Sequence, residues 1–156
     1  MGEHDACMEK IKAAMKDRAL YLAFLYRSFS KALPAEQAQA LARQAIYEYG
    51  RLKGKMDGGK ISAEDWVDRH MASGVAALFD SEVAKGEDGC EQTMEYCALL
   101  EAWKELGCSP EEMDLLCDIA MEVDRGRADY HGIPWEIPER MGKGDRRCRL
   151  VLKKNR

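Results

Sequence analysis

The sequence predicts an α+β fold in which helices pack against a small antiparallel β-sheet of about four strands. Two long helical segments open the chain, strand-like runs around a turn follow them, and an alternating strand comes last. The 156 residues, 46% hydrophobic and 33% charged, are enough for one domain with its own core. We therefore expect a single domain over 1–156, with an N-terminal helical hairpin in 1–60 and an α+β part in 61–152.

Apolar residues at three- and four-residue steps predict a first helix from Glu3 to Ala32. This stripe consists of Met8, Ile11, Met15, Leu22, Leu25 and Phe29. Arg18 interrupts the stripe at one position. Such a stripe packs against the rest of its own chain or, as the alternative, forms the interface of a homodimer.

Proline, glycine and serine mark the limits of the next two helices. The first helix ends at Leu33–Pro34, because proline disfavours helical backbone in the residue before it. Pro34 suits the first turn of a second helix that reaches about Lys55, and the two helices form an antiparallel hairpin. Ser62 is the N-cap of a short third helix, which Gly74 closes.

Four further segments favour strands. Val75–Ala84 and Cys90–Cys97 flank a loop with turn chemistry, so they predict two strands joined as a hairpin. Ile133–Glu139 contains two prolines and therefore fits an edge strand. After a turn at Gly142–Asp145, Arg147–Lys153 alternates apolar and polar residues, as a half-buried last strand does.

Two helices are predicted between these strands. The first begins near Leu99 and ends at Gly107, which serves as its C-cap. Ser109-Pro110, followed by two glutamates, is a strong helix start, with serine as N-cap and proline at the first helical position. We expect this helix to continue to about Asp129.

The uneven charge and the hydropathy exclude two classes of partner. Residues 62–129 carry 18 acidic and 5 basic side chains, a balance that repels phosphate backbones and argues against nucleic-acid binding. The longest wholly apolar stretch, Ala19–Tyr26, has eight residues, whereas a membrane helix needs about 20. The charged N-terminal segment lacks the apolar centre of a secretory signal, so we expect a cytoplasmic protein with no membrane partner.

The chain has six cysteines, which we expect to be reduced thiols in the cytoplasm. No two of them have the CxxC spacing of zinc fingers and thioredoxins. We therefore predict no cofactor. A metal ion held by two thiols, an imidazole and carboxylates is the alternative, with ligands scattered along the chain.

Candidate catalytic groups gather between residues 95 and 131. Cys97 stands where a strand passes into a helix, and a helix N-terminus lowers the pKa of a thiol. Glu101 follows one turn later, and Cys117 and Asp124 share a face of the next helix. If the two helices pack together, these four side chains line one cavity, where a carboxylate can serve as base for a thiol or a water.

The same region contains a family resemblance. The matching segments are YCALLEAWKELGCSPEEMDLLCDIAMEVDRG and GKGDRRCRLVL. The first has Cys97 before a tryptophan-containing helix that ends Leu-Gly, then Leu-Cys117-Asp118 and Asp124-Arg125-Gly126. The second has a Gly-Asp-x-x-Cys-x-x strand at 144–150. These features resemble the L-2-amino-thiazoline-4-carboxylic acid hydrolase family over about residues 75–152. Where the family often has a proline after the first cysteine, this chain has Ala98.

The resemblance implies a hydrolase that opens a cyclic amidine in a small molecule, by attack at the ring carbon between sulfur and nitrogen. It implies Cys97 as nucleophile or pocket thiol, Cys117 as its partner, and Glu101 or Asp124 as general base. Arg125 is the nearest cation for a substrate carboxylate.

Trp103 and His131 complete the substrate-binding candidates. A tryptophan in a helix is more often a core residue, and a histidine before Gly132 is more often a solvated loop residue. The closing strand also resembles those of small-molecule sensor domains. A non-catalytic binding or sensory module is therefore the alternative function, and a structural dimer built on the first helix is a third.

Overall fold

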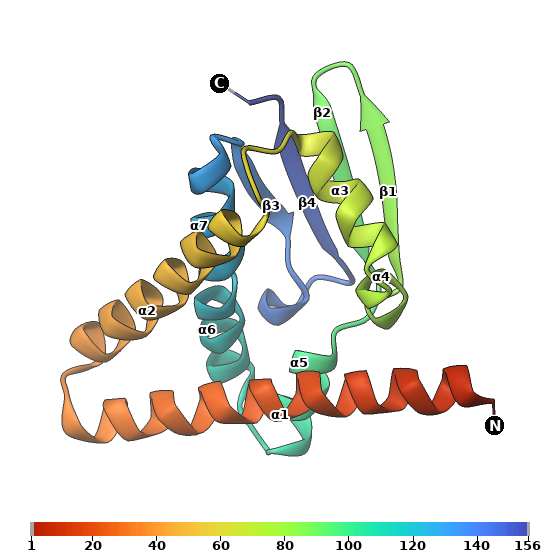
Figure 1. The fold of residues 1–156 in the computed structure, drawn as a ribbon. Coiled ribbons are helices and arrows are strands. Elements are labelled where there is room, and N and C mark those ends of the chain that lie inside the picture. Colours follow the sequence, from red (N-terminus) through yellow and green to blue (C-terminus); the bar gives the residue numbers. More distant parts are fainter. Residues whose placement is uncertain (1, 156) are drawn as a thin grey trace.

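Four strands form one antiparallel sheet in the computed structural model, which describes residues 2–155. They are β1 (Ser81–Gly86), β2 (Gly89–Met94), β3 (Trp135–Glu139) and β4 (Cys148–Lys153), in the order β1-β2-β4-β3. Helices cover one side of this sheet and extend beyond it (Figure 1). The predicted α+β class with about four strands is confirmed.

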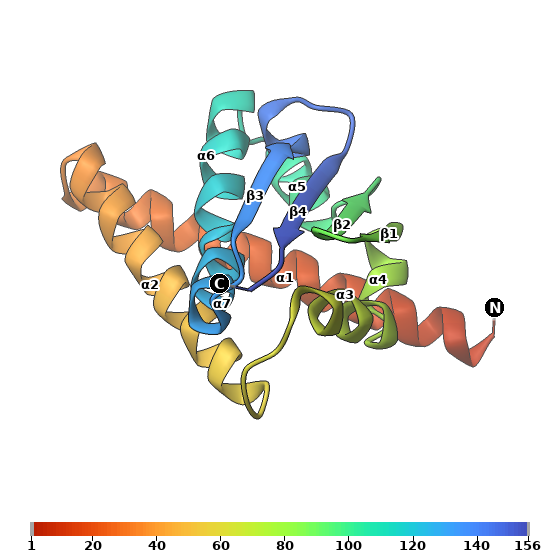
Figure 2. The same ribbon diagram turned by 90° about the horizontal axis from the view of Figure 1, so that it is seen from above.

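The N-terminal helical hairpin is confirmed as well, but its two arms diverge. Helix α1 (Glu3–Ala32) and helix α2 (Ala35–Met56) meet at Leu33–Pro34, where Pro34 precedes the first turn of α2. From this joint α1 runs beneath the domain against α5, while α2 runs against α7 (Figures 1 and 2). The two helices of the hairpin therefore pack mainly on other elements and less on each other.

The buried face of α1 differs in part from the predicted apolar stripe. Ala19, Ala23 and Tyr26 are its buried residues, whereas Ile11, Leu25 and Phe29 of the stripe are exposed. Small alanines allow α5 to approach α1 closely. Intramolecular packing therefore accounts for only part of the stripe. No helix among the described residues has the length and hydrophobicity to cross a membrane.

The third helix begins as predicted, but the segment after it is not a strand. Helix α3 (Ala63–Ala72) starts at Ser62, whose hydroxyl oxygen accepts a hydrogen bond from the Asp65 amide at 3.0 Å. After Gly74, with a left-handed φ of 74°, Val75–Leu78 forms a short helix, α4. Periodicity alone does not separate helix from strand in so short an apolar run. Strand β1 begins only at Ser81, and its hairpin with β2 is confirmed.

The predicted helix from Pro110 to about Asp129 is interrupted in the structure. Helix α5 (Ala98–Glu105) and helix α6 (Pro110–Ala120) begin as expected, but Met121 separates α6 from α7 (Glu122–His131). Beyond this break α7 lies against α2 at very short range. A Cβ atom on Gly126 would overlap the backbone carbonyl of Tyr47, and one on Gly50 that of Val123.

The sheet presents an alternating inner face to the helices. Strand β4 lies between β2 and β3, and its alternate residues Cys148, Leu150 and Leu152 are buried, as predicted. Their partners on β2 are Met94, Gln92 and Cys90, which point to the same side because paired residues of antiparallel strands share a face. Strand β3 is an edge strand, as its prolines predict, and the short 3₁₀ turn η1 (Met141–Lys143) links it to β4.

Two hydrophobic clusters make up the core. One joins α1, α2, α5 and α6, with Trp103 and Leu116 fully buried. The other joins α3, the end of α7 and the sheet, around Trp66, Val67 and Leu152. The space between the two clusters contains the candidate site.

Candidate functional site

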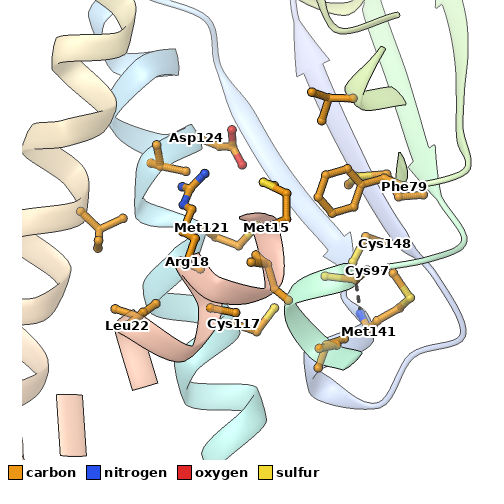
Figure 3. A pocket seen from close by; sticks show the side chains of 18 of the residues that line it. Met15, Arg18, Leu22, Phe79, Cys97, Cys117, Met121, Asp124, Met141 and Cys148 are labelled. Atoms are coloured by element: carbon orange, nitrogen blue, oxygen red, sulfur yellow. Dashed lines mark hydrogen bonds between the residues drawn. The ribbon is translucent and has the colours of Figure 1, made fainter. Parts of the chain in front are cut away.

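A cavity of about 550 Å³ lies where α1, α7, the α3–α4 segment and the inner face of the sheet meet. Its walls include Met15, Arg18 and Leu22 from α1 and Gln92 and Leu150 from the sheet. Figure 3 shows several of these side chains together with Asp124 and three cysteines. Three of the four predicted catalytic residues, Cys97, Cys117 and Asp124, line this cavity.

Asp124 lies in the first turn of α7 and contributes a carboxylate to the cavity. Within residues 2–155, the carboxylate forms no hydrogen bond or ion pair with another side chain. Burial raises the pKa of this carboxyl group, and Lys53, Arg127 and Arg18 lower it by a smaller effect. Asp124 is therefore an acceptor that can take up a proton more readily than an exposed aspartate.

Gln92 is a second polar group on the cavity wall, and the sequence interpretation missed it. Its side chain is only 3% exposed, and its Oε1 atom has no hydrogen-bond partner within the described part of the chain. A buried carbonyl oxygen without a partner is costly unless a ligand or a water supplies a donor. The sequence does indicate this orientation, because Gln92 lies two residues from both Cys90 and Met94, and alternate residues of a strand share a face.

Three thiols border the cavity near α5, α6 and β4 (Figure 3). Burial raises the pKa of Cys97, that of Cys117 to about 12 and that of Cys148 to about 11. The expected lowering at Cys97 is wrong: the amides of Leu99 and Leu100 do lower its pKa, but the loss of water outweighs them. All three thiols are therefore protonated at neutral pH.

Glu101 does not line this cavity. Its carboxylate faces α1, where it accepts a hydrogen bond from the Tyr96 hydroxyl and pairs with Lys16 at 3.1 Å. These two groups hold its pKa below the ordinary value. Glu101 and Cys97 both border a second pocket, of about 610 Å³, whose lining includes five exposed charged side chains: Glu95, Lys104, Lys143, Asp145 and Arg146. The predicted cavity shared by all four residues is therefore not formed.

Trp103 borders the cavity, but its polar atom is engaged elsewhere. The ring is fully buried, and Nε1 donates a hydrogen bond to the Ala19 carbonyl oxygen at 2.9 Å. This bond attaches α5 to α1. Trp103 is therefore a core residue, the more common role of a helical tryptophan, and it also borders the cavity.

Arg125 lies outside the cavity, although it is adjacent to Asp124 in sequence. Its guanidinium donates hydrogen bonds to Asp118 and Glu122, both at 2.7 Å, and lies over the Trp135 ring. It is therefore engaged in the packing of α6 against α7. Within the described residues Arg125 pairs with Asp118 and Glu122 and forms no ion pair with Asp124.

His131 is a buried helix residue and does not belong to a solvated loop. It is 4% exposed, its Nδ1 accepts a hydrogen bond from the Ile61 amide at 3.3 Å, and its Nε2 lies 2.8 Å from Asp57 Oδ2. These contacts join the end of α7 to the segment before α3. His131 does not line the cavity.

Arg18 is a basic residue of the cavity lining that was not among the predicted site residues. The residue that interrupts the apolar stripe of α1 is exposed, lines the cavity and points toward Asp124 in Figure 3. A second basic residue of the lining, Arg127, is occupied by an ion pair with Asp57 at 2.7 Å. Arg18, unlike Arg125, is therefore an exposed arginine that borders the cavity.

The scattered metal ligands suggested by the sequence do not converge. Within residues 2–155 no group of three or more histidine, cysteine, aspartate or glutamate side chains is placed to hold a metal ion. The histidine that lines the cavity, His70, has its Nε2 atom 3.0 Å from the Ser81 hydroxyl oxygen.

Comparison with known proteins agrees with the resemblance found in the second half of the chain. The family model for L-2-amino-thiazoline-4-carboxylic acid hydrolase matches residues 12–152, so the match also takes in the helical hairpin. A search of curated proteins and a search of solved structures each found no match. Because the family model covers most of the sequence, the chain belongs to the L-2-amino-thiazoline-4-carboxylic acid hydrolase family.

Proposed function

We propose that this protein hydrolyses a small cyclic amidine of the 2-amino-thiazoline type and that Asp124 is its catalytic carboxylate. Family membership supplies the reaction class. The observation that carries the proposal is the Asp124 carboxylate, which borders a large cavity without a hydrogen-bond partner among the described residues.

A carboxylate in this setting suits an amidine in two ways. A protonated amidine presents N–H groups in one plane, and carboxylate oxygens accept charge-assisted hydrogen bonds from such donors. A carboxyl group whose pKa is raised by burial is also a better general base near neutral pH. One oxygen can therefore bind the substrate while the other receives a proton from water.

The reaction begins when water attacks the ring carbon between sulfur and nitrogen, while Asp124 takes one of its protons. This step gives a tetrahedral intermediate and a protonated Asp124. The ring carbon–sulfur bond then breaks, and the proton from Asp124 passes to the departing sulfur. The resulting protonated urea loses its remaining proton to solvent, which leaves a carbamoyl group on nitrogen and a free thiol.

Water is the nucleophile in this proposal because the cavity thiols are protonated. Burial raises the pKa of both Cys97 and Cys117, and neither thiol forms a hydrogen bond with Asp124 among the described residues. A thiol acts as a nucleophile through its thiolate. We therefore assign Cys97 and Cys117 to the wall that contacts the substrate ring.

Arg18 supplies the positive charge for a substrate carboxylate. It borders the same cavity as Asp124, and it is one of the cations that lower the pKa of Asp124. A substrate with an amidinium and a carboxylate on one ring presents opposite charges close together. Arg18 and Asp124 offer the complementary pair.

The test follows the free thiol produced from L-2-amino-thiazoline-4-carboxylate, with the carbamoyl-cysteine product identified by mass. Asp124→Asn is expected to lower kcat about 100-fold or more, the usual contribution of a general base. Asp129→Asn is the matched control, because Asp129 also lies on α7 but is exposed and accepts a hydrogen bond from the Tyr47 hydroxyl. An equal loss in both variants, or no thiol with the unmodified protein, would contradict the proposal.

A non-catalytic binding module is the second candidate, favoured by the absence of a lowered thiol pKa at Cys97, Cys117 and Cys148. A module of this kind would be stabilised by the ligand without forming product. Thermal unfolding with and without 2-amino-thiazoline-4-carboxylate separates the two functions. A higher Tm with no product after prolonged incubation would indicate the binding module.

A further inference from the structure

The cavity is large for the substrate of the family. A 2-amino-thiazoline carboxylate is a single five-membered ring with two small substituents. The cavity measures about 550 Å³, within the range of about 300–1,000 Å³ that holds drug-sized ligands. A single small ring would leave much of this space to water.

The additional space is bordered by apolar side chains that pack in neither core cluster. Met15, Val75, Phe79 and Met94 line the cavity and are partly exposed, and neither of the two core clusters includes them. They come from α1, α4, the turn before β1 and the end of β2. An apolar group in the cavity would remove this surface from water, which is favourable.

Methionine is prominent in this wall. Four of the nine methionines in the chain line the cavity. Methionine side chains are flexible and polarisable, and they adapt to apolar groups of irregular shape. Phe79 adds a flat aromatic surface, which Figure 3 shows on the side of the cavity opposite α7.

The polar groups of the inner wall accept hydrogen bonds. Asp124 and the buried Gln92 Oε1 have no partners among the described residues. Three basic side chains with long stems also line the cavity: Arg127 pairs with Asp57, Arg18 is exposed, and Lys53 is half-buried with its ammonium 5.8 Å from the centre of the Tyr49 ring. The two unpartnered acceptors favour a ligand with N–H donors, and the Asp124 carboxylate favours a positive charge on those donors.

We propose that the cavity takes an amphipathic amidine, with its N–H head on Asp124 and Gln92 and an apolar or aromatic body against Met15, Phe79 and Met94. The proposed function is the basis for the amidine head, whereas the apolar body goes beyond it. The substrate class is then an amidine that carries a hydrophobic substituent.

Isothermal titration calorimetry with inert probes tests both halves of this proposal. Benzamidine, 4-butylbenzamidine, benzamide and 4-butylbenzoate vary the head charge and the apolar body separately. Each buried methylene strengthens binding about fourfold, so 4-butylbenzamidine is expected to bind at least tenfold tighter than benzamidine. Benzamide and 4-butylbenzoate are expected to bind at least tenfold more weakly than the amidine of the same size.

Two kinds of variant assign these effects to residues. Met94→Gln keeps the length of the side chain and is expected to reduce the advantage of the butyl group, with little change for benzamidine. Asp124→Asn is expected to weaken both amidines at least tenfold and to leave the ratio between them unchanged. Met71→Gln is the control, because Met71 is exposed on α3 and does not line the cavity.

These experiments can contradict the proposed ligand class and the proposed hydrolase activity independently of each other. If the butyl group adds nothing, or if 4-butylbenzoate binds as tightly as 4-butylbenzamidine, the amphipathic amidine is overturned, whether or not the aminothiazoline is hydrolysed. If the amidines bind as expected while no aminothiazoline is hydrolysed, the ligand class is supported and the hydrolase activity is not.

Discussion

Arg127 holds Asp57 by two parallel hydrogen bonds, from Nε to Oδ2 at 2.8 Å and from Nη2 to Oδ1 at 2.7 Å. Asp57 caps the end of α2, Arg127 belongs to α7, and the guanidinium lies over the Trp66 ring of α3 at 4.2 Å from its centroid. His131 approaches the same carboxylate. The Arg127–Asp57 ion pair joins α2 to α7, and α3 is attached to it by Trp66 and by Arg69, whose Nη1 lies 3.4 Å from Asp57 Oδ1. These contacts lie behind the cavity wall to which Arg127 and Trp66 belong.

This ion pair makes the stability of the protein sensitive to acid. Although burial alone would raise it, the hydrogen bonds from Arg127 and His131 lower the pKa of Asp57 from 3.8 to about 2. The stabilisation is present above the unfolded-state pKa and is lost as pH falls through about 2. Asp57→Asn is expected to lower the free energy of unfolding at pH 7 by about 2 kcal/mol, measured by urea unfolding.

The control for this prediction is Asp68→Asn. Asp68 pairs with Lys85 at 2.6 Å, but its side chain is 61% exposed, and exposed ion pairs contribute about 0–1 kcal/mol. A loss at Asp68 as large as the loss at Asp57 would contradict the special position of the Asp57 carboxylate.

Asp124→Asn is expected to stabilise the protein while it removes activity. Burial raises the pKa of Asp124, so the folded state pays for an ionised carboxylate at neutral pH. This cost grows as pH rises above the unfolded-state pKa of 3.8 and is absent below it. The Tm of the variant, measured by calorimetry, should therefore exceed that of the unmodified protein at pH 7, and the difference should vanish near pH 3. A lower Tm at pH 7 would mean that Asp124 has a stabilising partner.

The fold was predictable where the signals are local. Ser62 and Ser109 cap helices because a serine oxygen accepts from a backbone amide three residues later, and both bonds form. The break at Met121 has no comparable mark. Beyond the break, Gly126 packs closely against the backbone of α2, a contact that depends on residues distant in sequence.

The site was predictable in part for similar reasons. Asp124 and Arg125 are neighbours in sequence, but successive helical residues point about 100° apart, and only Asp124 borders the cavity. Cys97 and Glu101 are four residues apart, yet Cys97 is an N-cap with extended backbone, so the rule of a shared helical face does not apply to it. The inward orientation of Gln92 follows from the alternation of residues in β2, but the cavity that it borders depends on how the helices pack on the sheet, which sequence alone does not give.

Alkylation rates test whether water or a thiol is the nucleophile. Cys7 is exposed, whereas Cys97 and Cys117 have a pKa raised by burial. With iodoacetamide at pH 7.5, Cys7 is expected to react at least tenfold faster than these two, as measured by peptide mass spectrometry. All six cysteines should react at similar rates in concentrated urea. Faster labelling of Cys97 than of Cys7 would indicate a reactive thiolate and overturn the water mechanism.

Gly126→Ala is expected to destabilise the protein, against the usual trend. In an ordinary helix this change stabilises by about 0.5–1 kcal/mol. Here the new methyl group would overlap the carbonyl of Tyr47 on α2, and forced overpacking costs about 1–3 kcal/mol. Gly86→Ala is the control, because a Cβ there meets nothing closer than 3.7 Å. Equal urea midpoints for Gly126→Ala and the unmodified protein would show that α2 and α7 can separate freely.

Arg18→Gln tests the assignment of the substrate carboxylate. Because Arg18 borders the cavity beside Asp124 and Arg125 does not, losing its charge should raise KM for 2-amino-thiazoline-4-carboxylate about tenfold, as expected for a charge-assisted hydrogen bond. The same variant should leave KM for 2-amino-thiazoline without the carboxylate within about twofold. Arg125→Gln removes hydrogen bonds to Asp118 and Glu122, so it should lower the Tm without changing the preference between the two substrates. A loss of that preference in Arg125→Gln, and not in Arg18→Gln, would return the carboxylate to Arg125.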